Sequence, residues 1–219
     1  MGNNVYTKSA LAAVLIATQG GWAAAEEQAF EGWYLRTGPA GVFFRPSADL
    51  SIGGASVPGA DVKVDENYAI SVDIGYRFSE QWSATLTIGT PPEAELRGAG
   101  SLPPVELGKL RYGPSVLAGQ YHFKSNNPRF QPYIGAGLNY VVNLGESDGA
   151  ASDLEVKTKV GPMVQIGFES MVTEDVGLYF DVKKLWAEAD VSGSIGGAPF
   201  DAEVTLDPLI VGTGIIWRF

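Results

Sequence analysis

The sequence contains no cysteine, and this absence excludes several kinds of site. Without thiolates the chain can hold neither an iron–sulfur cluster nor a cysteine-ligated zinc ion, and it cannot form a disulfide bond. Its single histidine, His122, has no nearby set of carboxylates or cysteines beside it in the sequence. We therefore predict no metal site and no cofactor.

Basic residues are also scarce. The chain has 15 Lys and Arg against 25 Asp and Glu, which gives a formal net charge of -10. A surface of that sign repels the phosphate backbone of a nucleic acid instead of releasing its counterions. We therefore expect no nucleic-acid partner.

Long hydrophobic runs are missing as well. Residues 10–17 form a short apolar run near the N-terminus, whereas a helix that crosses a bilayer needs about 20 such residues. Lys8 precedes this run, and three alanines at 23–25 follow it. This order is typical of a secretory signal peptide. We expect residues 1–25 to be a cleaved signal peptide and residues 26–219 to form one exported outer-membrane β-barrel domain.

Beyond residue 30, apolar and polar residues alternate with a period of two, which is the signature of β-strands with two different faces. In residues 130–144, for example, the even positions are mostly apolar and the odd positions are mostly polar or small. An even number of strands suits a bacterial barrel. Eight such segments occur, at about 32–45, 66–78, 82–90, 109–124, 130–145, 157–172, 176–192 and 203–219.

The connections between these segments are alternately short and long. Tight turns are expected at 79–81, 125–129 and 173–175. In bacterial outer-membrane barrels short turns face the periplasm and long loops face outward. The sequence thus predicts an all-β fold, an eight-stranded antiparallel transmembrane up-and-down β-barrel. Its long loops are expected at 46–65, 91–108, 146–156 and 193–202.

A soluble lipocalin-like barrel or sandwich would alternate in the same way but would bury its apolar face. Two features favour a membrane barrel. Trp217 and Phe219 close the last segment on one apolar face, which resembles the signal read by the barrel-assembly machinery of bacteria. Aromatic residues also gather near the turn ends, as in the interfacial girdle of membrane barrels. They are Trp33, Tyr76, Phe78, Trp82, Tyr121, Phe123, Phe130, Trp217 and Phe219.

A series of short stretches follows in a distinctive order along the chain: Trp33–Gly38, Gly113–Ser115, Gln120–Phe123, Pro132–Tyr140, Val160–Gly161, Gln165–Gly167, Asp181–Lys184 and Leu206–Pro208. This order resembles the OmpW family of outer-membrane barrels over essentially the whole mature chain. The resemblance implies an eight-stranded barrel with a narrow, largely apolar lumen that passes small hydrophobic molecules. The Ala/Gly/Pro-rich segment 91–108 departs from the family pattern, so the identity of the ligand is not carried over.

Charged residues on the inward face lie close to the turn ends of the predicted strands. Eight strands leave an interior just wide enough for side chains. Opposite charges crowded there should pair, because a lone buried ion is costly. We predict a charged floor that closes the periplasmic end of the lumen, formed by Arg36, Asp73, Arg77, Glu169, Asp181, Lys183 and Arg218.

The opposite half of the lumen is predicted to be apolar and to bind the ligand, through Val116, Val141, Met163, Trp186 and Ile210. Near Lys183–Lys184 the apolar positions change from even to odd numbers, which predicts a β-bulge that turns Trp186 toward the lumen. Pro114 and Pro162 lie inside predicted strands, where proline removes a ladder hydrogen bond. Each marks either a lateral gap between strands or a bend with no role in transport.

We predict a non-enzymatic channel in the outer membrane of a Gram-negative bacterium. It would take up small hydrophobic molecules passively and release them sideways into the outer-membrane lipids. The alternative is a structural or adhesive small barrel of the OmpA or OmpX type without transport. A membrane-embedded hydrolase or acyltransferase would need a nucleophile site, and the sequence contains no G-x-S-x-G motif.

Overall fold

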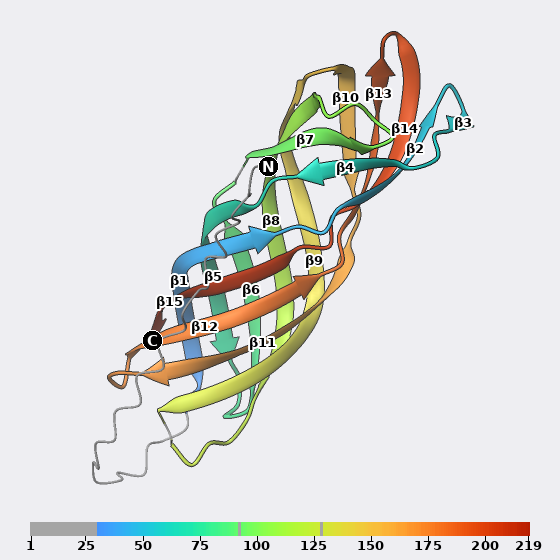
Figure 1. Ribbon diagram of the computed structural model, residues 1–219. Coiled ribbons are helices and arrows are strands. Elements are labelled where there is room, and N and C mark those ends of the chain that lie inside the picture. The colour runs from blue at the N-terminus through green and yellow to red at the C-terminus, as the bar shows by residue number, and fades with distance from the viewer. Residues whose placement is uncertain (1–29, 92, 128) are drawn as a thin grey trace, which may run out of the picture.

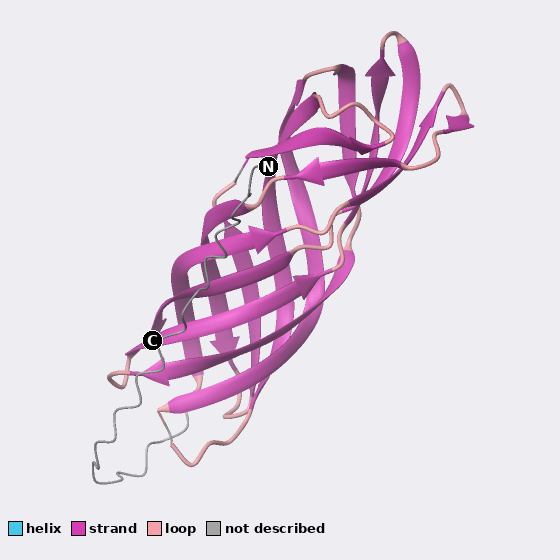
Figure 2. Cartoon of the chain, in the orientation of Figure 1, coloured by secondary structure: helices cyan, strands magenta, loops and turns pink. Residues whose placement is uncertain are grey.

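The computed structural model describes residues 30–91, 93–127 and 129–219, and the predicted signal peptide lies outside the described residues. All regular elements in the described ranges are β-strands (Figures 1 and 2). Among these residues there is no helix long and apolar enough to cross a membrane.

Eight long strands form a closed antiparallel barrel, in the order β1-β5-β6-β8-β9-β11-β12-β15, with β15 paired back to β1. Closure leaves no unpaired strand edge in the lipid. The predicted eight-stranded transmembrane barrel is confirmed. Its strands are β1 (Gly32–Phe43), β5 (Asn67–Arg77), β6 (Trp82–Gly89), β8 (Glu106–His122), β9 (Phe130–Asp148), β11 (Gly161–Met171), β12 (Val176–Leu185) and β15 (Leu209–Arg218).

The outward face of this barrel is apolar and exposed. Leu117 on β8 and Ile166 on β11, for instance, expose 60% and 61% of their surface. Such a face is stable only against lipid. Aromatic pairs lie near the end that carries the short turns, with ring centroids 5.1 Å apart in Trp33–Tyr76 and 5.0 Å apart in Trp82–Tyr121. We call this the lower end, as it is drawn in Figure 1.

Seven further strands continue the barrel beyond its upper end (Figure 2) and form a part of the molecule that we call the extension. Two of them, β4 and β7, extend the barrel sheet beside the upper part of β8, and the other five form a second sheet in the order β10-β13-β14-β2-β3. The segments predicted to be long loops are therefore largely strands, and the prediction is wrong in that respect. These strands are β2 (Ser47–Ile52), β3 (Ala55–Ser56), β4 (Ala60–Val64), β7 (Glu93–Gly100), β10 (Ala151–Thr158), β13 (Glu188–Ile195) and β14 (Ala198–Thr205).

The two faces of the chain exchange polarity between β12 and β13. Odd-numbered residues stay buried throughout, from Asp181 and Lys183 on β12 to Ala189 and Val191 on β13. The pairing of β12 with β11 and β15 continues past Lys183 without a register shift. The predicted bulge is therefore wrong. On β12 the apolar residues are even-numbered and face the lipid outside, whereas on β13 they are odd-numbered and face inward. The change arises because the outer surroundings change from lipid to water between these two strands.

Candidate functional site

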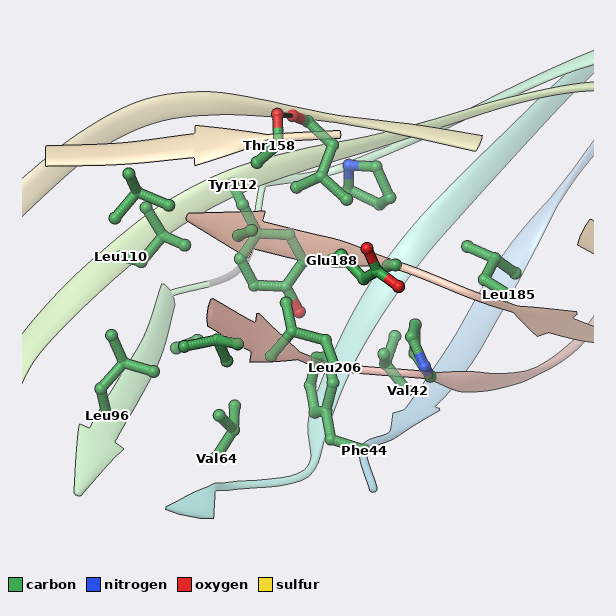
Figure 3. Close-up of a pocket in the computed structure, with 18 of the residues that line it drawn as sticks. Val42, Phe44, Val64, Leu96, Leu110, Tyr112, Thr158, Leu185, Glu188 and Leu206 are labelled. Carbon is green, nitrogen blue, oxygen red and sulfur yellow. Dashed lines mark hydrogen bonds between the residues drawn. The ribbon is translucent and has the colours of Figure 1, made fainter. Parts of the chain in front are cut away.

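The upper part of the barrel sheet and the second, five-stranded sheet enclose a narrow cavity whose wall is almost entirely apolar (Figure 3). About 820 Å³ of this space is not filled by atoms, and part of it is open to solvent. Leu96 and Leu110 reach it from β7 and β8, while Val191 and Val204 reach it from β13 and β14. The cavity exists because inward residues of the upper strands are apolar on both sheets.

Few polar groups stand in the wall, and they already have partners. The Thr158 hydroxyl donates to the Val141 carbonyl oxygen at 2.6 Å, and the Tyr112 hydroxyl accepts from the Asn67 amide at 3.5 Å. Glu188 lies at the edge with half of its side chain exposed, near Lys159. Because an unpaired polar group is costly to bury, this wall favours a neutral apolar ligand.

A second apolar cavity continues the first one outward. Leu50, Leu102, Leu154 and Phe200 line it, and about 530 Å³ is not filled by atoms. The two cavities share wall residues, among them Val191. Both cavities therefore lie along the inside of the extension and have apolar walls.

The structure distributes the five predicted lumen residues over three environments. Val141 and Ile210 line the cavity. Val116 and Met163 are buried in a small apolar cluster that Ile210 also contacts. Trp186 is 42% exposed and is not part of the cavity wall, whereas its neighbours on both sides are buried. The prediction that Trp186 faces the lumen is wrong, because the regular alternation turns it outward near the upper edge of the lipid-facing surface.

The seven residues predicted to form the floor lie together inside the lower half, and we call them the charged cluster: Arg36, Asp73, Arg77, Glu169, Asp181, Lys183 and Arg218. Glu169 is central: its Oε2 lies 3.2 Å from both Arg77 Nη2 and Arg218 Nη2, and its Oε1 lies 3.8 Å from Arg36 Nη1.

A second set of contacts lies next to these in the same cluster. Asp73 Oδ2 is 3.4 Å from Arg36 Nε and 3.7 Å from Lys183 Nζ, and Lys183 also pairs with Asp181. The cluster thus contains four cations and three anions, all held by mutual ion pairs inside the barrel.

Polar residues that were not predicted to belong to the floor complete this packing. Tyr133 accepts a hydrogen bond from Arg36 Nη1 at 2.6 Å and donates to Asp181 Oδ2 at 3.3 Å. Tyr34 and Gln120 are buried beside them and hydrogen-bonded to each other at 3.0 Å. Their inward positions follow from the alternation, but a tyrosine in a membrane strand is equally typical of the lipid interface.

The two prolines of the predicted lateral gap occupy different places. Pro114 lines the cavity, where the ladder on one side of β8 stops at Ile88↔Ser115 and resumes at Glu93↔Arg111. Pro162 on β11 is exposed on the outer face and paired with Leu138. Only Pro114 therefore combines an interrupted ladder with contact to the cavity.

The C-terminal residues complete the barrel wall. Trp217 pairs with Leu35 on β1, and the backbone N–H of Phe219 donates to the Trp33 carbonyl oxygen at 2.9 Å. The role of Trp217 and Phe219 in assembly stays a prediction.

Comparison with known proteins agrees with this geometry. The sequence profile of the OmpW family matches residues 32–219. The dibenzothiophene metabolism operon protein PahQ of Pseudomonas aeruginosa is 33% identical over 187 residues, which cover 85% of this chain and 88% of that protein. Outer membrane protein AlkL of Ectopseudomonas oleovorans is 31% identical over 172 residues, covering 78% and 74%. The crystal structure of OprG from Pseudomonas aeruginosa superimposes with a TM-score of 0.81 at 24% identity, covering 86% of this chain and 96% of OprG.

Proposed function

Because this chain belongs to the OmpW family of outer-membrane proteins, we propose that it is a channel for the passive uptake of small hydrophobic molecules. The observation that carries the proposal is the pair of neighbouring apolar cavities in the extension, which lie above the charged cluster. The transfer of a hydrophobic molecule from water to such a wall is favourable, because it lowers the free energy by about 25 cal/mol for each Å² of apolar surface buried.

The ligand then leaves sideways into the membrane. Directly below the cavity lie the apolar residues Val116 and Met163, and below these lies the charged cluster, whose residues are all buried except the half-buried Arg218. An apolar molecule cannot replace the ion pairs there without stranding buried charges. The ligand can instead enter the membrane lipid around the barrel, which is also apolar, without separating any buried ion pair.

One relative favours neutral hydrocarbons and their sulfur analogues as ligands. PahQ is a protein of a dibenzothiophene metabolism operon, and dibenzothiophene is an aromatic molecule without a hydrogen-bond donor. A molecule of this kind matches a wall whose few polar groups are already paired. We therefore propose neutral aromatic or aliphatic hydrocarbons as the substrate class.

Uptake measurements test this function. Cells that produce the protein should take up dibenzothiophene or a medium-chain alkane faster than cells without it, whereas uptake of a sugar of similar size should be unchanged. An equal gain for hydrocarbon and sugar would indicate a water-filled pore. No gain for either would favour a structural or adhesive barrel of the OmpA or OmpX type.

A further inference from the structure

The two apolar cavities of the extension meet at a small set of side chains. Among the described residues, Leu96 on β7, Val191 on β13 and Val204 on β14 line both cavities. Figure 3 shows Leu96 and Leu185 at opposite ends of the first cavity, and Leu185 belongs to the apolar cluster above the charged cluster. Leu96, Val191 and Val204 therefore lie at the outer end of the first cavity, and we call them the constriction.

On β7 and β13 the residue of the constriction is larger than its inward neighbours on the same strand. Two residues before it stands an alanine, and two residues after it stands a glycine. The side chains of the constriction thus project further between the two sheets than their neighbours do. The residues concerned are Leu96 with Ala94 and Gly98 on β7, and Val191 with Ala189 and Gly193 on β13.

The constriction has the shape of a slit. Val191 and Val204 come from neighbouring strands of the five-stranded sheet, where Val191 is directly opposite Ala202. They are therefore diagonal neighbours, whose side chains are within reach of each other. Leu96 belongs to the other sheet, so the opening lies between one leucine and two valines.

The backbone around the slit is held on both sides, because each of the three residues is paired with two neighbouring strands. Valine is also restricted in its χ1 torsion. The width of the slit is therefore set by the side chains, and Leu96 is the member with the greatest freedom to move. The paired residues are Val64 and Gly108 for Leu96, Val156 and Ala202 for Val191, and Ala189 and Ala48 for Val204.

The three side chains are pure hydrocarbon, so they can offer a ligand no hydrogen bond. A site of this kind discriminates between molecules only by their shape and size. A linear chain can enter a slit end-on and a flat ring system can enter it edge-on. A compact globular hydrocarbon is wide in every direction and must displace the side chains, which closely packed surroundings resist.

We propose that Leu96, Val191 and Val204 form a size filter, which admits linear and flat hydrocarbons to the first cavity and excludes compact globular ones. The inference rests on the proposed uptake function and adds to it the residues that determine specificity. It also assigns different roles to the two parts of the site: the apolar walls select against polar molecules, and the constriction selects among apolar molecules by their cross-section.

Enlarging the slit tests the filter. The two probes are n-decane and adamantane, which have the same number of carbon atoms but a linear and a globular shape. Wild-type cells should take up decane faster than adamantane. Leu96→Ala should raise adamantane uptake relative to decane by about tenfold, because a difference of a methylene or more in an apolar site is worth at least that factor. Rates are compared at equal amounts of folded protein in the outer membrane.

Leu110→Ala is the matched control, because Leu110 lies on the neighbouring strand β8 and lines only the first cavity. This variant removes the same atoms from the wall and should leave the uptake ratio unchanged. Equal uptake of both probes by the wild type, no rise in Leu96→Ala, or the same rise in both variants would overturn the filter. Wild-type cells that take up neither probe would instead overturn the uptake function itself.

Reversible modification of a cysteine tests the filter on protein that is already folded, and the chain has no cysteine of its own to interfere. Leu96→Cys should show a raised ratio of adamantane to decane uptake. Methyl methanethiosulfonate adds a methylthio group to this cysteine, which should return the ratio toward the wild-type value, and dithiothreitol should raise it again. The ratio in Leu110→Cys should not respond. With modification verified by mass spectrometry, the same response in both variants, or none in either, would contradict the proposal.

Discussion

Replacing Glu169 with glutamine is expected to destabilise the barrel by about 3–5 kcal/mol, the usual cost of breaking a buried ion pair from one side. Glu169 is fully buried and faces Arg77, Arg218 and Arg36 at 3.2, 3.2 and 3.8 Å. Without its charge, four cations of the charged cluster would face only Asp73 and Asp181. Urea unfolding of the protein in lipid or detergent measures the change in the free energy of unfolding.

Glu80→Gln is the matched control for this variant. Glu80 pairs with Lys124 at 3.0 Å, but both side chains are about half exposed or more, at 48% and 67%. A solvated pair of this kind contributes about 0–1 kcal/mol. If Glu169→Gln costs as little as Glu80→Gln, the charged cluster does not hold the lower half together.

Val191→Arg is expected to reduce hydrocarbon uptake by about tenfold or more, because a buried unpaired charge costs several kcal/mol and each 1.4 kcal/mol is worth about a factor of ten. Val191 is buried and lines both apolar cavities, so an arginine there would block the path and attract water into it. The measurement is the rate of dibenzothiophene uptake at equal amounts of folded protein in the outer membrane.

Ser192→Arg places the same side chain one residue further, on the outer face of the same strand. Ser192 lies between Glu155 and Asp201 on the neighbouring strands, so an arginine there is solvated and faces opposite charge. Uptake should stay within about twofold of the wild type, since surface changes are usually within ±0.5 kcal/mol. Equal losses in both variants would mean that the cavity is not the path of the ligand.

The barrel strands were predictable from the sequence because lipid outside and side chains inside impose a strict period of two. The upper extension was not recognised as strands, because its apolar face points inward and its segments are short and rich in glycine. Leu96 and Val64, which line the cavity, lie in segments that were expected to be loops. Trp186 was misplaced for the same reason: the polarity of the two faces was assumed to be constant along the strand.

The candidate site was predictable in part. Alternation alone placed Arg36 and Asp73 on the inward face, and the structure pairs them as register neighbours on β1 and β5. The contact of Glu169 with Arg77 joins strands on different sides of the lumen, and its geometry depends on the tilt and stagger of the barrel. The hydrogen bonds of Thr158 and Asn139 across strands likewise depend on where the ladders end, which no local pattern encodes.

The central claim is that a hydrophobic molecule crosses the upper half and leaves sideways, while the charged cluster keeps the lower half closed. The most direct measurement is the ion conductance of the purified protein in a planar bilayer, recorded with the same preparation that accelerates hydrocarbon transfer. The account predicts no steady current above that of the bare bilayer. A stable ohmic current that accompanies hydrocarbon transfer would show a continuous water-filled pore and would contradict it.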